Sequence, residues 1–340
     1  MTKKGLKISA RRYLAGLVVY GLGMVLFTQT NYYRGFIGHD TLLVLKTLFT
    51  IYVFAGWPFQ LLNIDSKDHK PSLLLKSIPL FLSAFSSFCF SFLPKSKVSR
   101  VEIDKKTKTT LLFFLVKLFY VPIMLNFFLS NGRGVIQIIA ARLTAHNLAF
   151  DFRTGYTDIF TIIFAIDTLY FAVGYLVEHP KLKNVVKSVE PTILGWAVAL
   201  ASYPPFNSIS TGYLNWYSSD YFYFPDYYID MTLKIVAVAC LALYLWATLS
   251  LGWKSSNLTN RGIVTNGAYK HLRHPAYTGK LIVWWITALQ HFSVGMILSM
   301  IAWTILYGMR AITEERHLIA DPDYKKYVAK TRFRFIPGLI

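Results

Sequence analysis

Long runs of apolar residues with almost no charge between them dominate the chain. Only 16% of its 340 residues are charged, whereas about 25% is usual for a soluble domain. A helix needs about 20 apolar residues to cross the hydrocarbon core of a membrane, and shorter runs must tilt or break. We therefore predict an all-α fold, a polytopic integral membrane helical bundle with about eight to nine transmembrane helices. The candidate spans are residues 13–27, 42–62, 73–93, 111–129, 159–177, 193–203, 232–253, 279–289 and 294–309.

The formal net charge is +19, and the basic residues lie in short polar segments between the apolar runs. This pattern indicates cytoplasmic loops that face anionic lipid, not a nucleic-acid surface. Residues 95–108, 181–187, 254–280 and 310–340 are the segments assigned to the inside. Nine full spans would then put the basic N-terminus outside, so one early segment is re-entrant, interfacial or not a span.

Other polar positions leave alternatives open. Residues 133–153 have a rough helical period and are expected along the interface, and residues 206–228, rich in Tyr, Phe and Trp, suit a loop at headgroup level. Asp167, in an apolar run, is a functional group, a partner of Lys117 or a protonated side chain. The chain's two cysteines, Cys89 and Cys240, fall in apolar runs and are read as small apolar side chains.

The segment of residues 262–285 carries the most information. Gly262 and Gly267 bracket a turn, and Pro275 is favoured at the first position of a helix, which should begin there. Several cations precede this helix start, which makes it a suitable site for an anionic group. They are Lys270, His271, Arg273 and His274.

A second polar element follows the last apolar run. Glu314 and Glu315 stand at its cytoplasmic end. Paired carboxylates are costly if they are buried without partners. We therefore expect them to face the cationic cluster or a polar ligand. A solvated helix end is the simpler alternative for both residues.

Together these two elements resemble isoprenylcysteine carboxyl methyltransferases and their phospholipid methyltransferase relatives. The shared order is V-T-x-G-x-Y-x-x-x-R-H-P-x-Y-x-G, then W-W, a membrane hairpin and E-E-x-x-L-I. It is carried by Val264, Thr265, Gly267, Tyr269, Arg273, His274, Pro275, Tyr277, Gly279, Glu314, Glu315, Leu318 and Ile319, and Tyr324, Tyr327 and Pro337 fit the family's ending. The resemblance covers residues 232–340, so we divide the chain into residues 1–230, of unassigned role, and residues 231–340, the methyltransferase core.

The resemblance implies that S-adenosylmethionine is the cofactor and that the loop and the helix start bind it at a cytoplasmic pocket. Arg273 would orient an acceptor group or the cofactor carboxylate, and Glu315 would contact the cofactor from the last helix; these two are the predicted catalytic residues. If the acceptor is an amine, His271 or Glu314 is the nearest base. The residues predicted to bind the cofactor are Tyr269, His271, Arg273, His274, Pro275, Tyr277, Gly279, Glu314 and Glu315.

The predicted reaction is methyl transfer to a lipid or lipid-modified acceptor, a carboxylate or an amine. One alternative is an NADPH-dependent reductase of the sterol type, which shares R-H-P-x-Y. Such reductases typically carry a K-x-x-F-R-x-N-P stretch upstream, and the comparable residues 254–263 lack its Phe and its Asn-Pro. The other is a non-enzymatic transporter or scaffold. His271 and His274 lack a third ligand, so no metal is expected. We prefer a bacterial inner membrane to the endoplasmic reticulum, and the sequence does not identify an oligomeric state.

Overall fold

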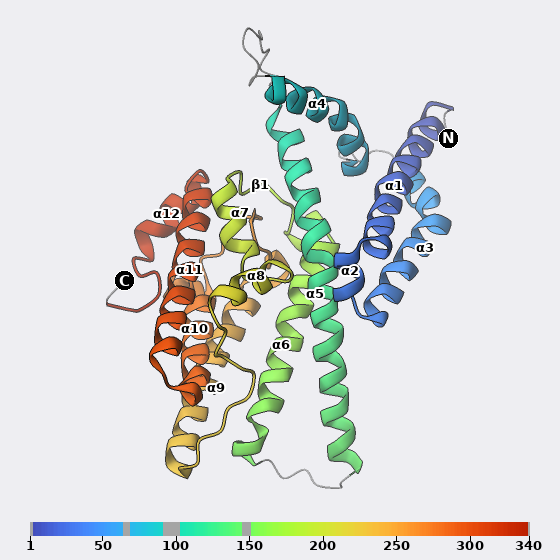
Figure 1. Ribbon diagram of the computed structural model, residues 1–340. Coiled ribbons are helices and arrows are strands. Elements are labelled where there is room, and N and C mark those ends of the chain that lie inside the picture. The colour runs from blue at the N-terminus through green and yellow to red at the C-terminus, as the bar shows by residue number, and fades with distance from the viewer. Residues whose placement is uncertain (1–2, 64–68, 91–102, 145–150, 339–340) are drawn as a thin grey trace. The chain divides into compact units, whose positions relative to one another are not determined.

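The computed structural model describes residues 3–63, 69–90, 103–144 and 151–338, most of them in helices (Figure 1). The α-helices are α1 (Lys3–Gln29), α2 (Asn31–Phe36), α3 (His39–Leu62), α4 (Lys70–Phe90), α5 (Lys105–Thr144), α6 (Phe152–Leu176), α7 (Ile193–Leu200), α8 (Phe206–Tyr213), α9 (Tyr227–Leu251), α10 (Pro275–Ala288), α11 (Val294–Leu318) and α12 (Pro322–Lys330). The short elements are η1 (Pro180–Leu182), η2 (Gly252–Lys254), η3 (Gly267–Lys270), η4 (Leu289–His291), β1 (Ser188–Val189) and β2 (Thr259–Asn260). Within these described ranges, the antiparallel pair of β1 and β2 is the one strand feature that the all-α prediction lacked.

The helices are those of a multi-pass membrane protein. Six stretches of the described residues are long and apolar enough to cross a membrane, namely α1, α3, α5, α6, α9 extended to Lys254, and α11. α7 has 8 residues and α10 has 14, so they rise about 12 and 21 Å, less than the ~30 Å hydrocarbon core. The count of eight to nine spans therefore stays a prediction. The end of the predicted run 73–93 and most of the basic segment 95–108 lie outside the described residues. The Cys89 side chain also lies outside the described part.

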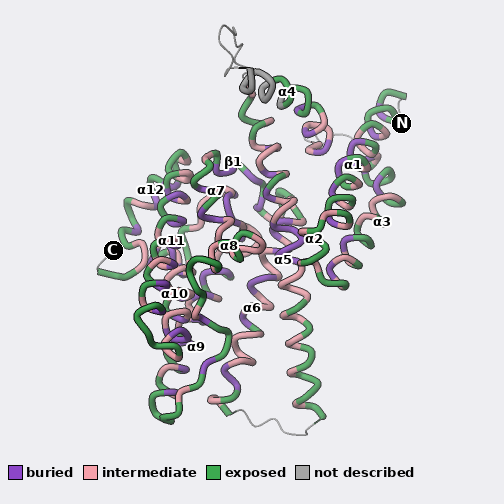
Figure 2. Tube along the Cα trace, in the orientation of Figure 1, coloured by how far each residue is buried: buried purple, intermediate pink, exposed green. Residues whose placement is uncertain are grey.

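Residues 133–153 were expected along the membrane interface, which stays a prediction, and the structure places residues 133–144 in helix α5. It continues without a break from Lys105 to Thr144, and no described residue from Ser130 to its end is buried (Figure 2). Gly134 lies against α6, where an added Cβ would be 2.8 Å from Thr161 Cγ2. The glycines at 132 and 134 therefore do not end this helix, and one of them permits close packing instead.

The chain divides into two compact units, Met1–Pro122 (unit 1) and Ile123–Ile340 (unit 2). In unit 1, α1 packs against α3 through a small residue. An added Cβ on Gly16 would lie 1.8 Å from the Tyr52 hydroxyl, so the ring of Tyr52 fits only because residue 16 is glycine. Tyr13 donates a hydrogen bond to the Val53 carbonyl at 2.7 Å, which fixes the same pair of helices.

In unit 2, α9 is packed between α6 and α10. The shared core includes Tyr156 from α6, Leu241 from α9 and Val283 from α10. Gly279 on α10 approaches the α9 backbone so closely that an added Cβ would lie 2.5 Å from the Cys240 carbonyl oxygen. These contacts fix the direction in which α10 leaves its first residue, and that residue begins the candidate site.

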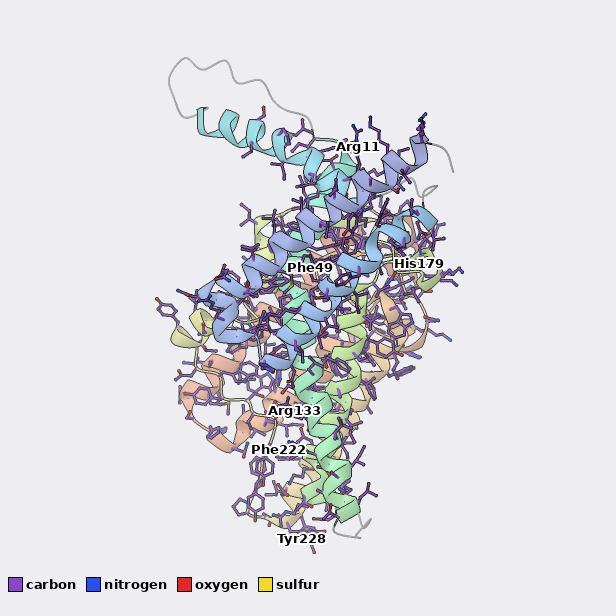
Figure 3. All side chains as sticks on the ribbon, turned by 90° about the vertical axis from the view of Figure 1, so that its right-hand side faces the viewer. Arg11, Phe49, Arg133, His179, Phe222 and Tyr228 are labelled. Atoms are coloured by element: carbon purple, nitrogen blue, oxygen red, sulfur yellow. The ribbon has the colours of Figure 1, made fainter. Side chains whose placement is uncertain are left out.

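The aromatic segment before α9 lies at the end of unit 2 away from His179, as the labelled Phe222 and Tyr228 show (Figure 3). Residues 206–228, predicted to be a loop, contain the short helix α8 and then an extended stretch. Arg153 of α6 bonds Asp230 at 2.7 Å, and Lys234 bonds the same carboxylate at 2.9 Å. This ion triad attaches the start of α9 to α6.

Candidate functional site

The site begins where α10 begins. Helix α10 begins at Pro275, as predicted from its place after a polar loop. The N–H groups of Arg273 and His274 donate to the carbonyls of Phe333 and Arg334, each at 2.9 Å. The C-terminal tail therefore pairs with the residues just before the helix and holds their side chains in a fixed orientation.

Glu315, near the end of α11, accepts hydrogen bonds from three side chains. Arg273 Nη1 lies at 2.8 Å, His274 Nε2 at 3.0 Å and Arg334 Nε at 3.1 Å. The carboxylate, Arg273 and His274 are largely buried. Charge-assisted bonds of this kind are strong and directional. Glu315 therefore fixes the two motif residues that precede α10, from a helix 41 positions further along the chain.

Glu314 points to the other side of the same histidine. Its carboxylate accepts a short hydrogen bond from the Tyr277 hydroxyl, and its second oxygen lies 3.9 Å from His274 Nδ1. The Tyr277 ring stacks on the His274 ring with a centroid distance of 5.4 Å. His274 therefore stands between two carboxylates, with Nε2 facing Glu315 and Nδ1 facing Glu314.

Arg310 is a site residue that the sequence analysis missed. It is 3% exposed, and its Nη2 donates to Asn257 Oδ1 at 3.1 Å. The guanidinium also lies over the rings of Tyr307 and Tyr277, at 4.9 and 5.3 Å. It precedes Glu314 by one helical turn on α11. An arginine within an apolar run, one turn before a carboxylate, was the available signal.

A second missed group comes from the segment between α6 and α7. Glu190, 2% exposed, accepts from Thr192 N at 3.0 Å and from Arg316 at 3.3 Å. The β1–β2 pair holds this segment beside the loop before η3, and Ser188 bonds His317 at 2.9 Å. Three contacts between distant parts of the chain therefore build this wall: Arg316 with Glu190, Ser188 with His317, and the β1–β2 pair.

A cavity of about 200 Å³ lies among these groups. Five of the predicted cofactor residues line it: Tyr269, Arg273, His274, Tyr277 and Glu314. The residues that line it without having been predicted to bind the cofactor include Glu190, Lys254, Asn257, Arg261, Gly262 and Arg310. Leu258, which also lines the cavity, has a positive φ of 63°. This backbone conformation is energetically costly for a residue other than glycine.

The remaining predicted residues lie outside the cavity lining. Glu315 acts through Arg273 and His274, as described above. Pro275 is the buried first residue of α10, and Gly279 faces the α9 backbone. His271 is exposed, with its ring 5.9 Å from that of Trp246. The structure thus gives Gly279 a packing role and puts His271 away from the cavity.

Tyr269 and the two tyrosines of α12 complete the outer wall. Burial raises the pKa of the Tyr269 phenol, and the nearby Glu314 carboxylate raises it further. Burial likewise raises the pKa of Tyr324 and Tyr327. The Tyr327 hydroxyl donates to the Tyr269 carbonyl at 2.8 Å. These phenols are therefore neutral donors at physiological pH, and they close the cavity below the helix ends.

The other polar positions singled out in the sequence have partners in unit 2. Asp167 accepts from the hydroxyls of Tyr244 and Thr248, at 2.7 and 2.6 Å. The Asn257 side chain is likewise buried and bonded to Arg310. Within residues 3–63, 69–90, 103–144 and 151–338, no group of three His, Cys, Asp or Glu side chains is placed to hold a metal ion.

Comparison with protein families decides which chemistry this arrangement resembles. Residues 226–321 match the phospholipid methyltransferase family. The matched segment contains the start of α10 and both Glu314 and Glu315, so the family predicted for the C-terminal third is confirmed. It points to methyl transfer to a lipid and does not favour the reductase or transporter alternatives. Searches of curated proteins and of solved structures gave no match.

Proposed function

We propose that unit 2 transfers a methyl group from S-adenosylmethionine to a lipid or lipid-modified acceptor at the cytoplasmic face of the membrane. One observation carries the proposal. Arg273, His274 and Tyr277 are distant from Glu314 in the sequence, all four belong to the matched family segment, and they line one cavity. The abundance of Lys and Arg in residues 254–280 and 310–340 supports the cytoplasmic side.

The polar groups around the cavity suit a zwitterionic, cationic donor. Arg273 Nε, Arg310 Nε and Glu190 Oε2 are buried and have no hydrogen-bond partner within the described part of the chain. Each such group costs about 1–3 kcal/mol, and a small rearrangement around a bound polar molecule would satisfy it. The Glu314 carboxylate supplies negative charge for a sulfonium, and the tyrosine rings supply faces on which a base can stack.

S-adenosylmethionine supplies an already activated methyl group, so the chain's own part is to position and to exclude water. Glu315 fixes Arg273 and His274 from behind, and Tyr277 fixes Glu314. A carboxylate acceptor needs no base. For an amine acceptor, Glu314 is the better candidate because it lines the cavity, whereas His271 is exposed away from it.

The test is a direct binding titration of S-adenosylmethionine and S-adenosylhomocysteine to the purified full chain in detergent. His274→Ala and Glu315→Ala should each weaken binding at least about tenfold, since each removes a charge-assisted contact that orders the cavity wall. His291→Ala, on exposed η4, is the matched control and should bind like the wild type. Wild-type affinity in both site variants would refute the assignment of the site. Transfer of a labelled methyl group to extracted lipid then tests the reaction itself.

A further inference from the structure

Two lysine ammonium groups converge above one glycine at the edge of the cavity. An added Cβ on Gly262 would lie 3.5 Å from Lys254 Nζ and 3.8 Å from Lys187 Nζ. Gly262 and Lys254 both line the cavity. Lys187 comes from the segment between α6 and α7, which the β1–β2 pair holds beside this loop. Two ammonium groups near the same point repel each other, and a bound anion would offset that repulsion.

The charges in this corner of the cavity are not balanced by the acids around it. Lys187 shares the Asp321 carboxylate at 3.3 Å, and Asp321 also accepts from Asn260 at 3.0 Å. Among the described residues, Lys254 has no ion pair. Positive charge therefore remains where Gly262 leaves space for a ligand.

The backbone of the same loop adds donors. Gly262 has a positive φ of 93°, and its N–H donates a hydrogen bond to Asn260 Oδ1 at 2.8 Å. The next two N–H groups, of Ile263 and Val264, donate to no acceptor in the part of the chain that the structure describes, and both residues line the cavity. Successive free N–H groups beside a glycine, with lysines above them, form a site that suits phosphate oxygens.

The sulfonium of the methyl donor would be repelled by the two ammonium groups, and the donor's carboxylate has Arg273 and Arg310 as alternative partners in the same cavity. An anion of the acceptor is the better match. Lys254 ends the candidate span that starts at Tyr227, so it lies at the depth of lipid headgroups. Basic pockets at this depth bind lipid phosphates.

We infer that Lys254, Lys187 and the Gly262–Val264 backbone form a subsite that binds the phosphate of the acceptor's headgroup. This rests on the proposed function and extends it, because it assigns the phosphate to residues other than those proposed to hold the methyl donor. Lys187 lies outside the matched family segment, so this chain supplies part of the headgroup site from its own upstream region.

The experiment is calorimetric titration of the purified full chain in maltoside micelles with three probes: dihexanoyl-phosphatidylethanolamine, dihexanoylglycerol and inorganic phosphate. The phospholipid should bind, and dihexanoylglycerol, which lacks the phosphate, should bind at least about tenfold more weakly. Lys254→Gln should weaken phospholipid binding about tenfold, Lys187→Gln should weaken it less because Asp321 shares that lysine, and Lys254→Arg should retain most of it. Lys326→Gln, on an exposed face of α12, is the matched control and should leave the affinity unchanged.

S-adenosylhomocysteine binding, measured on the same samples, separates the two proposals and reports folding. Its retention in Lys254→Gln together with loss of phospholipid affinity would support the phosphate site. Equal phospholipid affinity in Lys254→Gln and the wild type, or equal binding of dihexanoylglycerol, would overturn it. Tight binding of inorganic phosphate without phospholipid binding would overturn the lipid assignment. Failure of the wild type to bind S-adenosylhomocysteine would instead count against the proposed function.

Discussion

Replacing Asp230 with asparagine should destabilise unit 2 strongly. Asp230 is fully buried and accepts from Arg153 and Lys234, and also from the Phe224 N–H at 2.9 Å. The Lys234 side chain is 1% exposed, so asparagine would leave a buried ammonium without a counter-ion. Breaking one partner of a buried ion pair costs about 3–5 kcal/mol. Arg153 keeps its contact with the Tyr223 ring at 4.5 Å and is partly exposed, so we expect about 3 kcal/mol, a large share of a typical 5–15 kcal/mol.

The assay is unfolding in mixed micelles of maltoside and increasing sodium dodecyl sulfate, followed by circular dichroism. Asp226→Asn is the matched control because Asp226 is exposed and caps Ile229 N at 2.9 Å. Asparagine caps a helix as well as aspartate does, so its cost should stay below about 0.5 kcal/mol. Adding Lys234→Met to Asp230→Asn should restore stability, because it removes the uncompensated charge. If the double variant were no more stable than Asp230→Asn alone, the buried charge would not be the cause.

Two further predictions concern packing and pH. Gly279→Ala should cost about 1–3 kcal/mol in the same unfolding assay, because its Cβ meets the Cys240 carbonyl, whereas Gly308→Ala, with nothing within 4 Å of its Cβ, should be neutral or slightly stabilising; equal effects would contradict the close approach. Burial tends to raise the pKa of Asp321, but hydrogen bonds, including one from Asn260, outweigh it and hold that pKa below its usual value. This stabilisation is complete above the unfolded-state pKa of about 3.9 and is lost as pH falls through the lower folded-state value. The stability difference between wild type and Asp321→Asn should therefore be constant above about pH 5 and shrink as the pH falls below about 4. A difference that stays constant down to about pH 2 would refute the linkage.

Local patterns predicted the parts of the fold that depend on local chemistry. Pro275 begins α10 because proline fits the first turn of a helix and because the preceding residues are held by the tail. Glu314 and Glu315 were expected to need partners, and they have Tyr277 and Arg273. Here spacing and the cost of burying charge were enough.

Hydropathy alone was a poor guide to where helices end. The polar residues after 129 suggested a new segment, but α5 continues to Thr144, and its Gly134 packs closely against α6. The apolar run 193–203 suggested a span, but α7 stops at Leu200 after eight residues. The end of α7 has a local cause that hydropathy does not register, because Pro204 and Pro205 follow and proline cannot continue a helix. The close packing of α5 on α6 is a tertiary contact that hydropathy does not show.

The missed site residues depend on contacts that no local pattern contains. Arg310 gains its role from Asn257, which is 53 positions away. Glu190 belongs to a loop with no motif, and its partner Arg316 is 126 positions away. A buried charge with a distant partner becomes visible only when the chain is folded.

The cavity therefore requires more of the chain than its family segment. Residues 226–321 supply the start of α10, Arg310 and the two glutamates. Glu190 precedes that segment. Arg334 lies after it, and this residue donates a hydrogen bond to Glu315 and accepts one from the His274 N–H through its carbonyl. A fragment limited to the matched residues would leave Glu315 without one of its three donors and Arg316 without its buried acceptor. Because unpaired buried charges are costly, we expect the flanking segments to have the same structural importance for this cavity as the motif itself.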